Sequence, residues 1–448
     1  MPVAASTPEG QNLCDILVIG GGPAGSTVAA LLAEKGHRVT LLEKARHPRF
    51  HIGESLLPAN LPLFEKLGIR SAIEAIGMPK WGAEFVSPWH SHRQRFEFAE
   101  AWDKAMPYAF QVRRSEFDEI LIRNAARRGA EVIEGCQVQK VEFPAQDQGA
   151  IIQALDEAGV IHHWQTRFVI DASGRQTFLG HHFKAKRRNE RHNSASIYGH
   201  FAGARRHPGK EEGHISIFWF EHGWFWFIPL ADGATSVGVV AWPYYMQTRP
   251  QSKSLAEFFL DTIATCPALA ERLTEARLLT EVEATGNFSY VCDRTHGSNY
   301  LLLGDAYAFI DPVFSSGVML AMQSAFVGAD TVDICLRQPE AAPAALQHFD
   351  QMMKQGPRVF SWFIYRVTNP ALRDLFMAPR NALRMKEAIL SVLAGDIFGQ
   401  TPIWRSLLAF KAVYYLTSLL HPRRTFLAWQ RRRLNIRALE SFEGHPTS

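Results

Sequence analysis

A glycine-rich turn near the start of the chain has the residue types that bind the pyrophosphate of a dinucleotide. Residues 20–26 read GGGPAGS, which fits the pattern G-x-G-x-x-G. The first glycine permits a tight turn, the second lets a pyrophosphate approach the backbone, and the third allows close helix–strand packing. Glu43 follows at a spacing that suits hydrogen bonding to a ribose hydroxyl. We therefore predict that a dinucleotide contacts Gly20, Gly22, Pro23, Ala24, Gly25, Ser26 and Glu43.

The elements that must position this turn can be read from the same stretch. The apolar run 14–20 fits a buried parallel strand, a helix-like stretch covers 26–36, and 37–43 fits a second strand. The N-terminus of that helix would offer free N–H groups and a positive dipole end to the phosphates. A glycine turn without a ligand is the alternative, and it leaves the coincidence of strand, helix and acid unexplained.

Three later segments favour FAD over NAD. Residues 111–118 (QVRRSEFD) put Arg113 before a helix, and 169–175 (VIDASGR) end an apolar strand in a tight turn. Residues 301–306 (LLLGDA) end another strand at Gly304 and place Asp305 to hold a ribityl chain. In this order the segments resemble the flavoprotein monooxygenase superfamily over nearly the first 345 residues. The resemblance implies an α/β fold in which a Rossmann-like FAD domain, as in p-hydroxybenzoate hydroxylase, is interleaved with a β-sheet substrate domain.

Four further segments resemble signatures of the flavin-dependent halogenases. They are 53–58 (GESLLP, for G-E-S-x-x-P), 80–85 (KWGAEF, for K-x-G-x-x-F), 224–229 (WFWFIP, for W-x-W-x-I-P) and 309–317 (FIDPVFSSG, for F-x-x-P-x-x-S-x-G). The pattern is similar to the branch that acts on phenols and on carrier-tethered pyrroles, over about residues 12–400. The resemblance also implies FAD contacts from Lys44, Glu54, Ser55, Val138, Pro312 and Gly317.

The same resemblance implies a reaction and a catalytic residue. Reduced FAD, oxygen and chloride or bromide give hypohalous acid, which travels inside the enzyme to Lys80 and is directed from there to one carbon of the substrate. A lysine that acts as a neutral amine needs a lowered pKa, and the apolar neighbours Met78, Pro79 and Trp81 would lower it. The alternative is an ordinary solvated lysine.

Two other signatures allow a functional and a structural interpretation. Ser316 and Gly317 are small residues after a proline, and their backbone N–H groups could bind a halide beside the flavin. Alternatively, this loop only contacts the flavin, as in related hydroxylases. Trp224 and Trp226 lie two apart, so on a strand they face the same side. The resemblance implies that they keep substrate away from the flavin, and core packing is the alternative.

Composition and absent motifs limit the partners. No second G-x-G-x-x-G follows a later strand, so we expect a separate flavin reductase to supply reduced FAD. The five cysteines are scattered without a Cys-x-x-Cys pair, and the small, polar first dozen residues show no secretory signal but fit a loose tail. These features predict a cytoplasmic protein without a metal site. We expect a small aromatic substrate, free or on an acyl carrier protein, and no nucleic acid, because no recognition motif is present.

The family topology predicts how the chain is divided. The FAD domain would take 12–75, 106–180 and 285–345, and the β-sheet substrate domain 76–105 and 181–284. A helical region would follow over 346–448. Residues 351–448 carry a net charge of +10 against −6 for the remainder.

The C-terminal region has no assigned role. Residues 401–422 are apolar but marginal for a membrane span, and 423–433 mix basic and aromatic residues. Three uses compete with simple packing of a solvated basic face: a cover over the substrate pocket, a dock for an acidic carrier protein, and contact with a membrane surface.

Halogenation of an electron-rich aromatic is the leading hypothesis. An FAD-dependent aromatic hydroxylase would keep every FAD motif but make Lys80 dispensable. A polyprenyl-type flavin reductase would need no oxygen, and a non-catalytic binding protein would retain FAD poorly.

Overall fold

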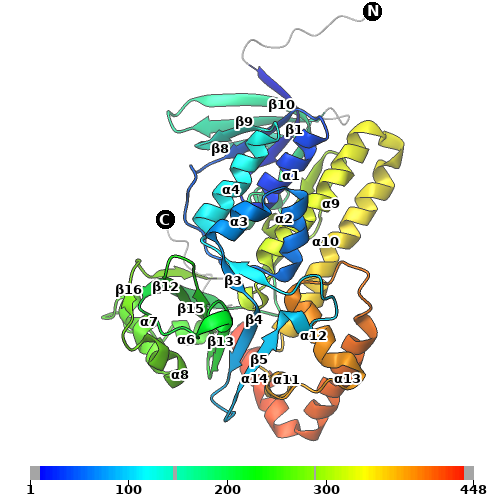
Figure 1. The fold of residues 1–448 in the computed structure, drawn as a ribbon. Helices are drawn as coiled ribbons and strands as arrows, with labels where there is room; N and C mark the ends of the chain where they lie inside the picture. Colours follow the sequence, from blue (N-terminus) through cyan, green and yellow to red (C-terminus); the bar gives the residue numbers. More distant parts are fainter. Residues whose placement is uncertain (1–10, 145–148, 287–288, 438–448) are drawn as a thin grey trace, which may run out of the picture.

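The computed structural model describes residues 11–144, 149–286 and 289–437, and the expected N-terminal tail falls almost entirely outside them. Two sheets and a set of C-terminal helices make up the described part (Figure 1). The first sheet has the order β7-β2-β1-β10-β9-β8, with β19 also pairing with β10. Its parallel strands are β7 (Glu131–Glu134), β2 (Val39–Glu43), β1 (Gln11–Ile19), β10 (Ile161–Asp171) and β19 (Tyr300–Leu302).

The first half of β10 extends into an antiparallel ribbon with β9 (Ala150–Asp156) and β8 (Cys136–Glu142). Helix α1 (Pro23–Glu34) packs against both α4 (Arg114–Arg127) and α9 (Gly317–Arg337), and α10 (Ala342–Ile364) packs outside α9. The shorter α2 (Leu61–Lys66), α3 (Arg70–Ile76) and α5 (Phe178–His182) complete this part. Within the described ranges, α9 alone is long and apolar enough for a bilayer crossing, and over half of it is buried against its neighbours.

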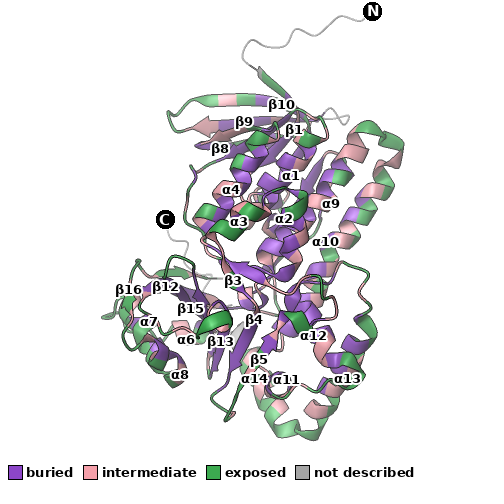
Figure 2. Ribbon diagram, in the orientation of Figure 1, coloured by how far each residue is buried: buried purple, intermediate pink, exposed green. Residues whose placement is uncertain are grey.

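The second sheet has the order β16-β12-β15-β14-β13-β4-β5, with β17 on β12. Its strands are β4 (Gly82–Val86), β5 (Arg93–Glu97), β12 (Ala195–Ala202), β13 (Ile215–Phe220), β14 (Gly223–Pro229), β15 (Thr235–Ala241), β16 (Arg277–Leu278) and β17 (Glu283–Thr285). Both faces of its central strands β13, β14 and β15 are buried (Figure 2). Alternate residues of β14 therefore pack in opposite directions: Phe225 and Phe227 towards α7 (Leu255–Ala264), and Trp224 and Trp226 towards the cluster that includes the C-terminal helices.

Two small sheets join these parts: β3 (Met78–Lys80) with β6 (Ala109–Gln111), and β11 (Lys186–Arg188) with β18 (Tyr290–Cys292) and β20 (Ala308–Phe309). The remaining helices are α6 (Pro243–Met246), α8 (Pro267–Ala270), α11 (Pro370–Met377), α12 (Met385–Ala394), α13 (Trp404–Leu420) and α14 (Pro422–Arg437).

The predicted strand–helix–strand unit at 14–43 is confirmed, as are the strand before Gly304 and the helical C-terminal region up to residue 437. Residues 195–241, within the stretch expected to form a β-sheet domain, contain the strands β12 to β15. The first sheet takes strands from three separate stretches of the chain, and β4 and β5 of the second sheet lie between two of them. This interleaving brings residues far apart in sequence to one site.

Candidate active site

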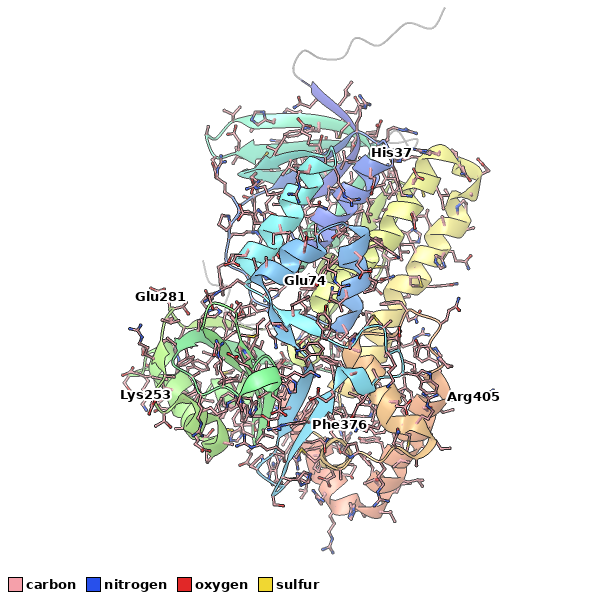
Figure 3. The ribbon with its side chains drawn as sticks, viewed as in Figure 1. His37, Glu74, Lys253, Glu281, Phe376 and Arg405 are labelled. Carbon is pink, nitrogen blue, oxygen red and sulfur yellow. The ribbon has the colours of Figure 1, made fainter. Side chains whose placement is uncertain are left out.

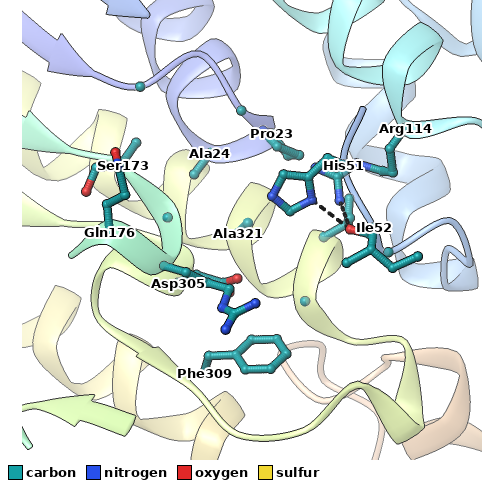
Figure 4. Close-up of a pocket in the computed structure, with 18 of the residues that line it drawn as sticks. Pro23, Ala24, His51, Ile52, Arg114, Ser173, Gln176, Asp305, Phe309 and Ala321 are labelled. Atoms are coloured by element: carbon teal, nitrogen blue, oxygen red, sulfur yellow. Dashed lines mark hydrogen bonds between the residues drawn. The ribbon is translucent and has the colours of Figure 1, made fainter. Parts of the chain in front are cut away.

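A cavity of about 880 Å³ lies where the carboxyl ends of β1, β2 and β10 meet the N-terminal ends of α1 and α9 and one face of the second sheet. Figure 4 shows part of it, with Ala24 and His51 on one side and Asp305 and Phe309 on the other. Cavities of this size hold large cofactors, and the carboxyl end of a parallel sheet is where such folds bind them.

The glycine turn forms one end of the cavity, and the three glycines of its G-x-G-x-x-G pattern have different surroundings. Gly20 has a φ of +98°, which favours glycine, and a Cβ at Gly25 would lie 1.8 Å from the Gly20 carbonyl oxygen. A Cβ at Gly22 would instead face open space, with only Arg49 Nη2 at 3.7 Å. The turn therefore needs Gly20 and Gly25 for its own packing, while Gly22 leaves room for a ligand beside an arginine.

Glu43 is buried beside this turn and organises it. Its carboxylate accepts hydrogen bonds from the backbone N–H of Gly21 at 2.6 Å and of Ala45 at 2.9 Å. Two oxygens offer about four acceptor positions, so the carboxylate can still accept bonds from a ribose.

Asp305 also lines the cavity, in the turn after β19. Burial raises the pKa of its carboxyl to about 6, and no described residue hydrogen-bonds to that group. A half-buried carboxyl that faces a cavity of cofactor size suits the hydroxyls of a ribityl chain. The glycine turn and Asp305 together fit FAD.

Arg114, rather than the predicted Arg113, lies in the cavity wall. Arg114 binds Asp118 through two hydrogen bonds of 2.8 and 2.9 Å and donates a third to the Ile52 carbonyl, where His51 also converges (Figure 4). Arg113 lies at the N-cap of α4, one residue earlier, and its side chain turns away to pair with Asp232 at 2.7 Å.

A buried glutamate–histidine contact joins the loop after β2 to the second sheet. His200 Nε2 on β12 lies 3.0 Å from both carboxylate oxygens of Glu54, and both side chains are about 1% exposed. Glu54 also lines the cavity. The pair therefore fixes the cavity loop against the second sheet.

Lys80 lies immediately behind the cavity wall and is only 1% exposed. Its Nζ donates hydrogen bonds of 2.9 Å to Ser55 Oγ and to the Leu56 carbonyl, and it lies 5.3 Å from the centre of the Phe98 ring. Burial lowers the pKa of the amine to about 7. Lys80 does not line the cavity, but Ser55 does, so one hydrogen bond separates the amine from the cavity wall.

Trp224, Trp226 and Ile228 of β14 line the part of the cavity next to the second sheet. The centres of the two indole rings lie 6.1 Å apart, and Trp226 Nε1 donates a hydrogen bond to Ser236 Oγ at 3.2 Å. Both tryptophans are also members of a buried core cluster, so the wall and the core packing are parts of one structure.

The loop before α9 reaches the cavity through Pro312, Ser315 and Gly317. Ser315 adopts a left-handed conformation with φ of +54°, which turns the chain into α9. Ser316 is buried outside the wall, and its carbonyl accepts the hydrogen bond from Leu320 N that begins the helix. Gly317, the first helical residue, brings the positive end of a 21-residue helix to the cavity.

The structure brings most of the predicted FAD and wall residues to this one cavity. Those that line it are Gly20, Gly22, Pro23, Ala24, Glu43, Lys44, Glu54, Ser55, Val138, Asp305, Pro312, Gly317, Trp224 and Trp226. Those that support it from behind or lie outside it are Gly25, Ser26, Arg113, Gly304, Ser316 and Lys80.

Arg49, Arg114 and His200 were not predicted. Arg49 follows no motif, although 46–51 is rich in basic residues, whereas Arg114 lies in the segment 111–118, from which Arg113 was predicted. His200 is one histidine among eighteen, and only the pairing of β12 beside β15 shows where it lies.

A parallel sheet with a glycine turn, a ribose-binding acid and an acid at the end of a late strand defines an FAD-binding oxidoreductase. Comparison with known proteins gives the family. The profile described as "Tryptophan halogenase" matches residues 15–105 and 91–371. The chain therefore belongs to this family of FAD-dependent halogenases.

Individual relatives agree with this assignment. The tryptophan 2-halogenase of Chondromyces crocatus is 36% identical over 344 residues, which are 76% of this chain and 65% of that protein. The 1H-pyrrole-2-carbonyl-[peptidyl-carrier protein] chlorinase of Pseudomonas fluorescens is 28% identical over 410 residues, 86% of this chain and 89% of that protein.

Solved structures share the fold. The myxobacterial chondrochloren halogenase CndH has a TM-score of 0.76 and 30% identity, covering 91% of this chain and 96% of its own. A flavoprotein/dehydrogenase from Cytophaga hutchinsonii has a TM-score of 0.82 and 28% identity, and the match covers 92% of this chain and 100% of that chain.

Proposed function

We propose that this protein uses reduced FAD, oxygen and chloride or bromide to halogenate an electron-rich aromatic ring, and that Lys80 delivers the halogen. One observation carries the proposal. A fully buried lysine, with a pKa near 7, lies one hydrogen bond behind the wall of a cavity that fits FAD.

The surroundings of Lys80 suit a neutral amine that accepts an electrophile. A neutral amine has two N–H donors and one lone pair, and Ser55 and Leu56 provide two acceptors at 2.9 Å. The lone pair then stays free. Reaction with hypohalous acid forms an N–halogen bond and releases water, and the aromatic carbon then takes the halogen while its proton leaves.

Other side chains have supporting roles in this proposal. Bound FAD, once reduced, supplies the electrons that activate oxygen for oxidation of the halide. The N–H groups at the start of α9, from Gly317 onwards, would bind the halide beside it. Trp224 and Trp226 would exclude the substrate from the cavity.

We propose a phenol or a carrier-tethered aryl or pyrrole as substrate, which the likeness to the pyrrole-carrier chlorinase supports. A separate flavin reductase would supply reduced FAD, because no second dinucleotide motif appears in the sequence. The cytoplasm is the proposed compartment, which five free cysteines support.

The test is oxidation of the enzyme-bound reduced FAD by oxygen in a stopped-flow spectrometer, with and without bromide. Bromide should change the course of flavin reoxidation. A panel of phenols and pyrrolyl thioesters, supplied with a reductase and bromide, should then give products with the bromine isotope pattern. Hydroxylated products with no response to bromide would contradict the proposal.

A further inference from the structure

Helix α13 has apolar residues on both of its sides. Leu407, Phe410 and Tyr414 are buried in the core cluster that also contains α11 and α12. The opposite side exposes Leu408 by 70% and Leu419 by 75%. The same side also exposes Trp404, Tyr415, Leu416 and Leu420. Contiguous apolar surface of this kind marks an interaction site.

Helix α14 continues this surface and contacts the rest of the protein through a few polar residues. Thr425 Oγ1 donates to the Ser418 carbonyl at 3.0 Å, and Arg432 donates to the carbonyls of Tyr365 and Arg191 at 2.6 and 2.5 Å. Two surface ion pairs add to this contact, Arg424 with Asp374 at 3.2 Å and Arg431 with Glu221 at 3.4 Å. Most other described side chains of the helix are exposed. Large apolar ones among them are Phe426, Leu427, Trp429 and Leu434, which are 50–67% exposed.

Basic residues lie among these apolar ones, and two of them, Arg424 and Arg431, pair with Asp374 and Glu221 of neighbouring elements. Residues 401–437 contain eight lysines and arginines and no aspartate or glutamate. Arg405 lies at the outer edge of α13 (Figure 3), and Arg433 lies 5.1 Å from the Trp429 ring centre. The surface is therefore complementary to an anionic partner that also accepts large apolar side chains.

A second copy of the chain, an acidic carrier protein and a lipid bilayer differ in how well their charge and apolar surface match this face. A second copy docking through the same face would place the exposed Arg405, Arg423 and Arg433 close to their own counterparts. An acidic carrier protein would match the charge but would leave most of the exposed leucines of α13 in water. A helix rich in Leu and Trp with Arg or Lys between them is typical of the bilayer interface. The 17 residues of α13 are too few to span a bilayer, and its inner face is already packed.

We propose that the outer face of α13 and α14 binds the surface of an anionic lipid bilayer. The arginines contact lipid headgroups, and the leucines and aromatic residues enter the boundary between headgroups and acyl chains. This proposal does not depend on the halogenase activity. It gives the enzyme access to substrates that partition into membranes.

The test is flotation of the FAD-loaded full-length protein with vesicles. We expect binding to vesicles of equal parts phosphatidylcholine and phosphatidylglycerol, and at least about tenfold weaker binding to phosphatidylcholine alone. Salt at about 1 M should weaken the binding, because it screens the charges. The triple variant Leu408→Gln/Leu419→Gln/Leu420→Gln should lose at least about tenfold in affinity for the anionic vesicles.

A matched variant controls for loss of exposed apolar surface in general. Leu13, Val160 and Ile161 are 51–52% exposed on the first sheet, far from α13 along the chain. The triple variant Leu13→Gln/Val160→Gln/Ile161→Gln should bind vesicles like the wild type. Equal binding by both triple variants would overturn the proposal. So would absence of vesicle binding, a dimer that only the α13 variant dissociates, or tight binding of an acyl carrier protein that abolishes vesicle binding.

Discussion

The Nζ atom of Lys80 lies 2.9 Å from Oγ of Ser55, and Ser55 itself lines the FAD-sized cavity. The same short loop therefore contacts both the cofactor space and the amine. Glu54, one residue earlier, is fixed by His200 of the second sheet. A shift of this loop would move the cavity wall and the hydrogen-bond acceptor of Lys80 together.

Replacing Lys80 separates halogen transfer from cofactor binding. Lys80→Met keeps the unbranched shape and all but one atom of the length of the buried side chain, and it removes the amine. We expect loss of brominated product by at least about a hundredfold, the scale of a catalytic side chain, with unchanged FAD affinity. Mass spectrometry measures the amount of brominated product, and titration of flavin fluorescence measures the FAD affinity. Lys66→Ala, a change on the solvent side of α2, is the control. Full bromination by Lys80→Met would refute the role of the amine.

The pKa of Lys80 also predicts how stability depends on pH. The unfolded lysine keeps its proton up to about pH 10.5, whereas burial lowers the folded pKa to about 7. Between these values the unfolded state binds more protons, so the free energy of unfolding rises with pH, by about 1 kcal/mol per unit. Urea unfolding of the wild type and of Lys80→Met at pH 7 and pH 9 measures this. From pH 7 to pH 9 the free energy of unfolding of the wild type should rise relative to that of Lys80→Met. An equal change in both proteins would contradict a lowered pKa of Lys80.

Two glycine variants distinguish the glycines that the turn needs to fold from the glycine that it needs to bind FAD. Gly25→Ala should prevent correct packing of α1, because the added Cβ would lie 1.8 Å from the Gly20 carbonyl oxygen. Gly22→Ala should leave the apoprotein as stable as the wild type but weaken FAD binding, since its Cβ would enter the open space beside Arg49. Thermal melting of the apoproteins and FAD titration give the comparison. Equal FAD affinity for Gly22→Ala and wild type would refute this position for the pyrophosphate.

Asp305 should affect FAD binding and apoprotein stability in opposite directions. Asp305→Asn weakens the proposed contact with the ribityl chain, so we expect lower FAD affinity by about tenfold. Its folded pKa is raised from 3.8 to about 6, so the folded state binds more protons between these values. Apoprotein stability should therefore fall as pH rises from about 4 to 6, and Asp305→Asn should remove that fall. Urea titrations between about pH 4 and pH 6 measure the free energy of unfolding of both apoproteins. If it falls with pH as steeply in Asp305→Asn as in the wild type, another group is responsible.

Local patterns predicted the glycine turn, Glu43, Asp305 and the strands around them, because each depends on a few consecutive residues. The position of Lys80 behind Ser55 depends on the pairing of β3 with β6, which no local pattern specifies. Similarly, Arg113 and Arg114 are adjacent in sequence, and only the start of α4 decides which one faces the cavity. The Glu54–His200 pair joins residues 146 positions apart, so it could not be read from spacing.

The central position of β10 determines when FAD can bind during synthesis of the chain. β1 carries the glycine turn, but its partner β10 begins 150 positions later, at residue 161. The last wall residues, on α9, extend to Ala321. At about 5–20 residues per second, the ribosome takes roughly 15–60 s to progress from the turn to this helix. During that interval the nascent chain exposes strands that lack their partners, and the cofactor cannot yet stabilise them.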